Sequence, residues 1–194
     1  MYKFTLEKIH NYAIIILPSM IGKAWCKVFS AGEHVVYGTN GICLVDDIGP
    51  MRNSEDEDKL FYILRPVNSA ASVLYVPLDN SALCGKMRYV YTKEQLDSVL
   101  TDVKNNSLNW IGDRKVRLNT FREMLHSGDM MTHILLVSCI LDKKKLLDEA
   151  GKRLSDADDH VLRSAERIVS EEFAWVLGIS KNEVGSYIQN YLGK

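Results

Sequence analysis

The segment Tyr91-Thr92-Lys93-Glu94-Gln95 marks the point at which the hydrophobic pattern of this chain changes its period. Before it, apolar residues form short runs separated by Gly, Pro and Asn, such as Val35-Val36-Tyr37 and Leu60-Phe61-Tyr62-Ile63-Leu64. After it, apolar residues recur every three or four positions, as in Val161, Leu162, Ala165, Ile168, Val169, Phe173 and Val176. Short runs bounded by turn residues are typical of strands, and the later spacing is typical of amphipathic helices. The sequence therefore predicts an α+β protein of two domains.

The first domain, residues 29–91, is predicted to contain five short strands, at about 33–37, 41–48, 59–66, 72–77 and 87–91. Gly38-Thr39-Asn40-Gly41 forms a turn between the first two, because Gly and Asn tolerate positive φ. Five short strands in so few residues usually close into a small barrel, since closure removes exposed strand edges. We expect an SH3/Tudor-like five-stranded β-barrel.

The second domain, residues 92–194, is predicted to be a bundle of about five helices. Thr92 and Gln95 form a capping box at the start of the first helix, and Ser180 with Glu183 forms one at the start of the last. A second helix begins near Asp113 and ends at Ser127-Gly128, Asp129 caps the third, and the long fourth helix follows Ser155 and ends at Gly178. Short connections between helices of ten to twenty residues indicate a compact bundle.

The composition is that of a globular protein without catalytic motifs. The chain has 194 residues, a formal net charge of −1 and 46% hydrophobic residues. Acidic residues outnumber basic ones in 29–91 and almost balance them in 92–194, so neither domain binds nucleic acid by overall charge. The apolar run Tyr12–Leu17 is interrupted by Pro18 and is too short to span a membrane. We expect a cytoplasmic monomer with no membrane segment.

No cofactor, metal site or enzymatic activity is predicted. The four cysteines are widely spaced and form no CxxC pair. Asp156, Asp158, Asp159 and His160 resemble a metal cluster, but they occupy the first turn of a helix, where carboxylates complement the helix dipole. The run Lys143-Lys144-Lys145 is either a DNA-facing patch or a solvated helix end, and the second interpretation is favoured.

Several segments in order resemble the CarD/CdnL family of bacterial transcription regulators. They are FSAGEHVVYGTNGICLVDDI from Phe29, LYVPLDN from Leu74, Asn109-Trp110, FREMLHSGD from Phe121, GKRLSDADDHVLRSAERIV from Gly151 and EEFAWVLGIS from Glu171. The first domain also resembles the RNA-polymerase-interacting domain of the transcription–repair coupling factor. The resemblance covers residues 29–192.

The resemblance implies a regulator that binds the RNA polymerase β subunit and is associated with the nucleoid through the polymerase. It also implies contact with promoter DNA at the upstream edge of the transcription bubble, where a tryptophan wedges into the minor groove and stabilises the open complex. That role falls on Trp110, with Arg114, Lys115 and Arg117 as neighbouring DNA-binding residues. Where relatives have a pair of arginines after the tryptophan, this chain has Ile111, Gly112 and Asp113.

On the polymerase-facing side, the resemblance points to Arg52 near the second hairpin and to Leu74 and Tyr75 on the fourth strand. An exposed edge of that strand can also pair through its main chain. Leu74 and Tyr75 are alternatively one core and one solvent residue of an ordinary strand. Trp110 is alternatively a core anchor that packs one helix on the next.

A second hypothesis follows from these alternatives. The chain would then be an SH3/Tudor-like protein-interaction adaptor without a DNA role. The position of Trp110 discriminates between the two hypotheses, because a DNA wedge must be exposed and a core anchor must be buried.

Residues 1–28 form an extension to which the resemblance does not reach. Relatives commonly start at the position of Phe29, and valine is encoded by GTG, a bacterial start codon. We therefore expect translation to begin at Val28, which would leave residues 1–27 untranslated.

Overall fold

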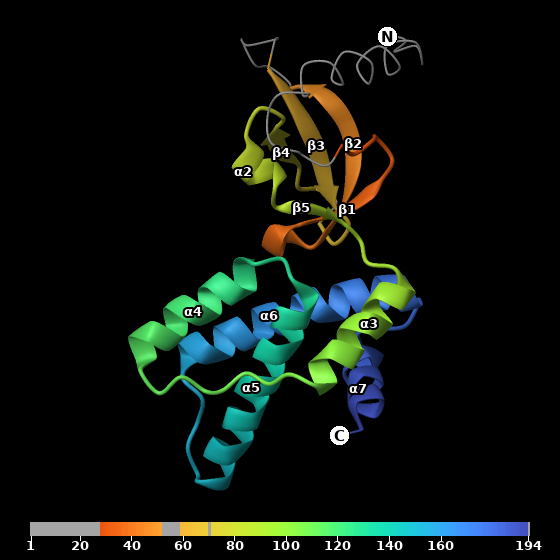
Figure 1. Ribbon diagram of the computed structural model, residues 1–194. Coiled ribbons are helices and arrows are strands. Elements are labelled where there is room, and N and C mark those ends of the chain that lie inside the picture. The colour runs from red at the N-terminus through yellow and green to blue at the C-terminus, as the bar shows by residue number, and fades with distance from the viewer. Residues whose placement is uncertain (1–27, 52–58, 70, 194) are drawn as a thin grey trace.

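The computed structural model describes residues 28–51, 59–69 and 71–193. A sheet is followed by helices, which confirms the predicted α+β class (Figure 1). We refer to residues 29–91 as the sheet region and to residues 92–193 as the helical region. The expectation about a start at Val28 concerns residues 1–27, which lie outside the described part of the chain.

Five strands form one antiparallel sheet with the order β4-β3-β2-β1-β5. Their bounds are His34–Tyr37 for β1, Ile42–Pro50 for β2, Leu60–Pro66 for β3, Leu74–Pro77 for β4 and Met87–Tyr89 for β5. All five lie where the hydrophobic runs predict them. The register between β2 and β3 shifts between Val45 and Asp47, where a β-bulge bends the longest strand.

The expected closure into a barrel is not seen. Among the described residues, β5 pairs with β1 and β4 pairs with β3, and no pairing joins β4 to β5. The chain between these two edge strands forms a helical turn, α2 (Ser81–Cys84), whose Cys84 is buried in the sheet core. The Cys84 thiol donates to the carbonyl oxygen of Pro77 at 3.3 Å. A helical turn rather than a further strand therefore connects β4 to β5, and among the described residues the sheet stays open.

The helical region contains α3 (Lys93–Lys104), α4 (Arg114–His126), α5 (Met130–Glu149), α6 (Asp156–Leu177) and α7 (Lys181–Leu192). With α2, the described residues hold six α-helices, where about five were expected. Both predicted capping boxes, at Thr92 and at Ser180, are confirmed. Gly178 ends α6 in the left-handed conformation with φ +66°.

Three hydrophobic clusters stabilise these elements. One lies within the sheet and includes Phe29, Tyr62 and Leu64, all almost fully buried. A second joins α4, α5 and the first half of α6, and a third joins α3, α7, the start of α5 and the end of α6. Helix α6 thus contributes to both helical clusters, and Figure 1 shows it lying across the helical region below the sheet. None of the described helices is long and apolar enough to cross a membrane.

The turn between β1 and β2 brings the sheet against α6. The short 3-10 helix η1 (Gly38–Asn40) leads to Gly41, which has φ +76° and ψ −150°. This conformation is essentially restricted to glycine. A Cβ atom on Gly41 would lie 2.6 Å from Oε2 of Glu171, a nearly buried side chain of α6. Gly41 therefore permits both the turn and the close approach of the two regions.

We predict that Gly41→Ala lowers the free energy of unfolding by more than Gly38→Ala does. An alanine at Gly38 would have positive φ, at a cost of roughly 1–2 kcal/mol, and no atom lies within 4 Å of its Cβ. An alanine at Gly41 would have a backbone conformation that is essentially restricted to glycine, which costs more. The variant at Gly41 must in addition displace the ion-paired Glu171 carboxylate. Urea unfolding of the two variants measures the difference, and equal losses would contradict a close approach of Gly41 to Glu171.

Candidate functional site

Trp110 lies in the connection between α3 and α4 and is partly exposed. Its ring packs edge-on against Phe121 of α4, with centroids 5.8 Å apart and an interplanar angle of 73°. Two cations lie over the indole: Cζ of Arg117 at 4.3 Å and Nζ of Lys143 at 5.6 Å from the ring centroid. The indole is therefore anchored at the edge of the helical core and still reaches the surface.

Arg117 is the least accessible of the four residues proposed to bind DNA, with 7% of its surface exposed. Its Nε and Nη2 donate to the two carboxylate oxygens of Asp158 at 3.0 and 3.1 Å. Its Nη1 donates to the carbonyl oxygens of Ile111 at 2.8 Å and Gly112 at 3.2 Å. The guanidinium thus joins α6 to the two residues that follow Trp110, and this favours a positioning role over phosphate contact.

Asp158 completes this arrangement from the first turn of α6. Burial acts to raise the pKa of its carboxyl, but hydrogen bonds from Arg117 and Ser155 outweigh burial and hold that pKa below its ordinary value. The Ser155 hydroxyl donates to Asp158 at 2.6 Å, while the backbone N–H of Asp158 donates to the same hydroxyl at 3.3 Å. Asp158 is therefore charged and serves as the partner of Arg117 as well as part of the cap.

Arg114 and Lys115 occupy the exposed first turn of α4. No carboxylate of the described residues forms an ion pair with either of them. Asp113, the N-cap of α4, accepts a hydrogen bond from the backbone N–H of Val116 at 2.8 Å. The Asp113 carboxylate therefore caps the start of α4. Arg114 and Lys115, the next two residues, can still bind an anion.

Two residues of this site were not assigned to it from the sequence. Asp158 was attributed to helix capping alone, because its partner Arg117 lies 41 positions away in the chain. Lys143 was one of three consecutive lysines, and periodicity gave no reason to prefer it. The position of Lys143 over the Trp110 ring depends on how the helices pack, so no local sequence pattern could have indicated it.

The residues proposed to bind the polymerase lie on the edge strand β4. Leu74 is half-buried and packs against the sheet core, whereas Tyr75 lies on the other face, edge-on to Phe61 with centroids 6.1 Å apart. Because β4 pairs only with β3 among the described strands, its second edge is open to main-chain pairing. Arg52 lies outside the described residues and stays a prediction.

An ion pair connects the sheet region to the helical region. Arg88 of β5 donates from Nη1 and Nη2 to the two carboxylate oxygens of Glu172 on α6, both at 2.7 Å. Nε of Arg88 donates to the carbonyl oxygen of Gly128 at 2.8 Å, and Glu172 accepts the backbone N–H of Tyr91 at 3.0 Å. The Glu172 side chain is 2% exposed and that of Arg88 is 17% exposed. This bidentate, almost buried pair fixes the position of α6 relative to β5.

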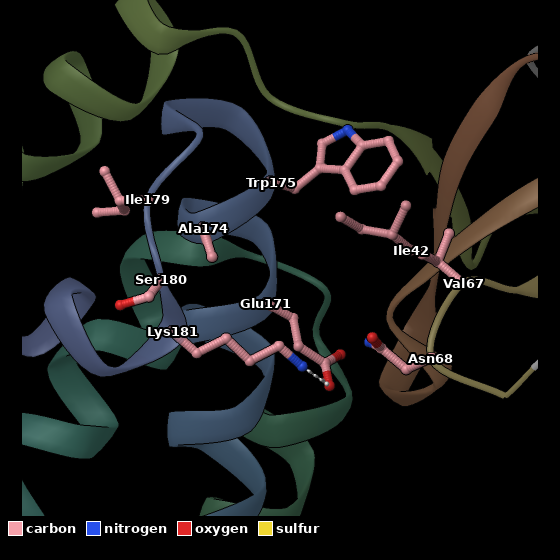
Figure 2. Close-up of a pocket in the computed structure, with 9 residues that line it drawn as sticks. All are labelled: Ile42, Val67, Asn68, Glu171, Ala174, Trp175, Ile179, Ser180 and Lys181. Atoms are coloured by element: carbon pink, nitrogen blue, oxygen red, sulfur yellow. Dashed lines mark hydrogen bonds and ion pairs between the residues drawn. The ribbon is translucent and has the colours of Figure 1, made fainter.

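A cavity of about 350 Å³ lies beside this junction. Figure 2 shows Glu171 and Trp175 of α6 and Lys181 of α7 on one side of it, and Ile42, Val67 and Asn68 on the other. Glu171 is ion-paired with Lys181 at 3.2 Å and with Arg167 at 3.3 Å. Within the described ranges, no group of three or more His, Cys, Asp and Glu side chains is placed to hold a metal ion. The cavity therefore lies at the junction of the sheet region and the helical region.

His133 is a buried titratable group close to the junction. Its Nε2 donates to the carbonyl oxygen of Leu125 at 3.0 Å, while its buried Nδ1 has no hydrogen-bond partner in the described part of the chain. Burial lowers the pKa of His133 below its ordinary value of 6.5, and the positive charge of Arg88 acts in the same direction. The hydrogen bond to Leu125 and the carboxylates of Asp129 and Glu172 oppose this effect without cancelling it. His133 is therefore held in its neutral form.

We predict that Glu172→Ala lowers the free energy of unfolding by about 3–5 kcal/mol, because it leaves the Arg88 guanidinium largely buried without its carboxylate. Partial exposure of Arg88 favours the lower end of this range. The matched control is Asp159→Ala on the same helix, whose pair with Arg163 is solvent-exposed and should contribute less than about 1 kcal/mol. Chemical denaturation compares the two, and similar losses would show that the junction pair contributes no more than a surface pair.

We also predict that His133 makes the protein less stable in mild acid. Its pKa is lower in the folded state than in the unfolded chain, so the unfolded chain binds more protons once the pH falls below about 6.5. Stability is then lost between the unfolded pKa and the lower folded pKa. His133→Gln keeps a donor for Leu125 but does not titrate, so its thermal stability should fall less between pH 7 and pH 5. An unchanged pH dependence would exclude His133 as a cause.

A family model matches the sheet region. No curated protein matches the chain. Residues 29–90 match the family model of the CarD-like/TRCF RID domain, which spans all five strands and α2. The sheet region is therefore similar in sequence to the CarD-like/TRCF RID domain.

Proposed function

We propose that this protein is a transcription regulator that binds RNA polymerase through the sheet region and contacts promoter DNA through the helical region. The observation that carries the first part is the match of residues 29–90 to the CarD-like/TRCF RID domain. In this proposal, residues 29–91 and 92–194 act as separate domains, and neither performs catalysis.

On the polymerase side, β4 supplies the contact with the β subunit. Its open edge offers main-chain donors and acceptors to a strand of the partner, and Tyr75 adds an aromatic surface on the outer face of the sheet. Arg52 is proposed as a further contact. Leu74, which packs inward, holds the strand in position.

On the DNA side, Trp110 is the proposed minor-groove wedge at the upstream edge of the transcription bubble. Arg114 and Lys115, which are exposed in the first turn of α4, are proposed to contact phosphates. Arg117 is engaged by Asp158 and holds the backbone that follows Trp110. The helical region has no strong positive charge. Binding to the polymerase raises the effective concentration of this weak DNA contact, so it stabilises the open complex despite its low intrinsic affinity.

We predict that Trp110→Ala shortens the lifetime of polymerase–promoter open complexes while polymerase binding is unchanged. Stacking of an aromatic side chain on a base contributes ~1–3 kcal/mol, which corresponds to a several-fold to roughly hundredfold effect. Trp110→Phe should retain part of the effect, and Val116→Ala, at an exposed position of α4, serves as the control. Thermal melting of each variant is measured in parallel.

Two outcomes would favour the adaptor without a DNA role. In one, Trp110→Ala binds polymerase and has the wild-type open-complex lifetime. In the other, its only defect is a sharp loss of stability, as expected when a packed tryptophan is removed from a core. Failure of the wild-type chain to bind polymerase would overturn the proposal itself.

A further inference from the structure

We infer that Lys143 of α5 is an additional DNA-phosphate contact, so that the DNA surface is built from two helices rather than from α4 and its preceding loop alone. This inference rests on the proposed function. It adds a residue that lies 33 positions from Trp110 in the chain but next to it in space.

The position of Lys143 follows from the packing of α5 against α4 and α6. Its Nζ lies over the Trp110 ring, 5.6 Å from the centroid, and its side chain is half-buried. Among the described residues no carboxylate forms an ion pair with it. The aliphatic part of the side chain is thus ordered against the indole, while the ammonium group keeps its charge unpaired.

The second cation over the indole does not have this freedom. Arg117 uses its donors on Asp158 and on the carbonyl oxygens of Ile111 and Gly112. A phosphate beside Trp110 would therefore have to displace a buried ion pair to reach Arg117. Lys143 can turn its flexible side chain towards the phosphate, because it gives up only a contact with an aromatic face.

The neighbouring lysines are placed differently. Successive residues of an α-helix project about 100° apart, so three consecutive lysines cannot face the same partner. Lys144 lies close to Glu166 on α6: burial raises the pKa of Glu166, and the charge of Lys144 opposes that rise. Lys145 is exposed. The geometry thus selects Lys143 from a run in which the sequence makes all three equivalent.

The test measures how binding depends on salt. The full chain is titrated against a fluorescein-labelled duplex with an unpaired bubble, and its affinity is measured by anisotropy between about 50 and 200 mM salt. Each phosphate contact contributes a slope of about −0.9 to the logarithmic salt dependence. Lys143→Gln should therefore lose one unit of slope, which makes the loss of affinity across this range roughly threefold smaller than in the wild type.

Two variants complete the experiment. Lys145→Gln removes the same charge from the same helix and should keep the wild-type slope, whereas Lys143→Arg should restore it. If the wild-type chain binds DNA and Lys143→Gln keeps its slope, or if Lys145→Gln loses as much, the inference about Lys143 is overturned and the proposed function is not. If the wild-type chain shows no salt-dependent binding to the isolated bubble but prolongs the open-complex lifetime, the same variants are compared by that lifetime: Lys143→Gln should shorten it and Lys145→Gln should not, and equal lifetimes would overturn the inference about Lys143. If the wild-type chain neither binds the bubble nor affects the open-complex lifetime, the DNA role is overturned together with Lys143.

Discussion

The pair between Arg88 and Glu172 is the interaction on which the arrangement of this molecule depends. It joins the last strand of the sheet to the C-terminal part of α6. Arg88 also donates to the carbonyl oxygen of Gly128, which lies just before α5, and Glu172 accepts the backbone N–H of Tyr91, which lies just before α3. One guanidinium and one carboxylate therefore connect the sheet to three helices. Because the pair is almost buried, either group without the other would carry an uncompensated charge. An arrangement of the sheet region and the helical region that separates Arg88 from Glu172 would therefore be unstable.

The same chemistry recurs at the other end of α6. Arg117 and Asp158 form a second bidentate pair. The remaining nitrogen of Arg117, Nη1, donates to the carbonyl oxygens of Ile111 and Gly112, which follow Trp110. Helix α6 thus carries two buried carboxylates, Glu171 and Glu172, towards the sheet and a third, Asp158, towards the indole. Its two ends lie in separate hydrophobic clusters, and rigid packing between them links the position of Trp110 to that of β5. The proposed wedge therefore has a defined orientation relative to the sheet that is proposed to bind polymerase.

This rigidity matters because the proposed contacts are individually weak. An open strand edge and an aromatic side chain on β4 form a modest interface, and a few unpaired cations around a half-exposed indole form another. If both partners belong to one promoter complex, a rigid connection sets a high effective concentration for the second contact without any increase in net charge. A molecule of formal net charge −1 can then act on DNA only where polymerase has placed it.

The sequence by itself determined the secondary structure and its order. The five strands, both capping boxes, the Asp129 cap and the glycine end of α6 are encoded within a few residues of each other, where local hydrogen bonding decides the outcome. It also indicated Trp110 through a resemblance to known regulators. Only the tertiary structure decided that β4 and β5 do not pair among the described residues, so that the sheet stays open. It also decided that Arg117 is engaged by Asp158, while no carboxylate of the described residues forms an ion pair with Lys143. These outcomes depend on residues that are tens of positions apart in the chain. Helix packing decides which charged side chains come into contact, and no local sequence pattern specifies that packing.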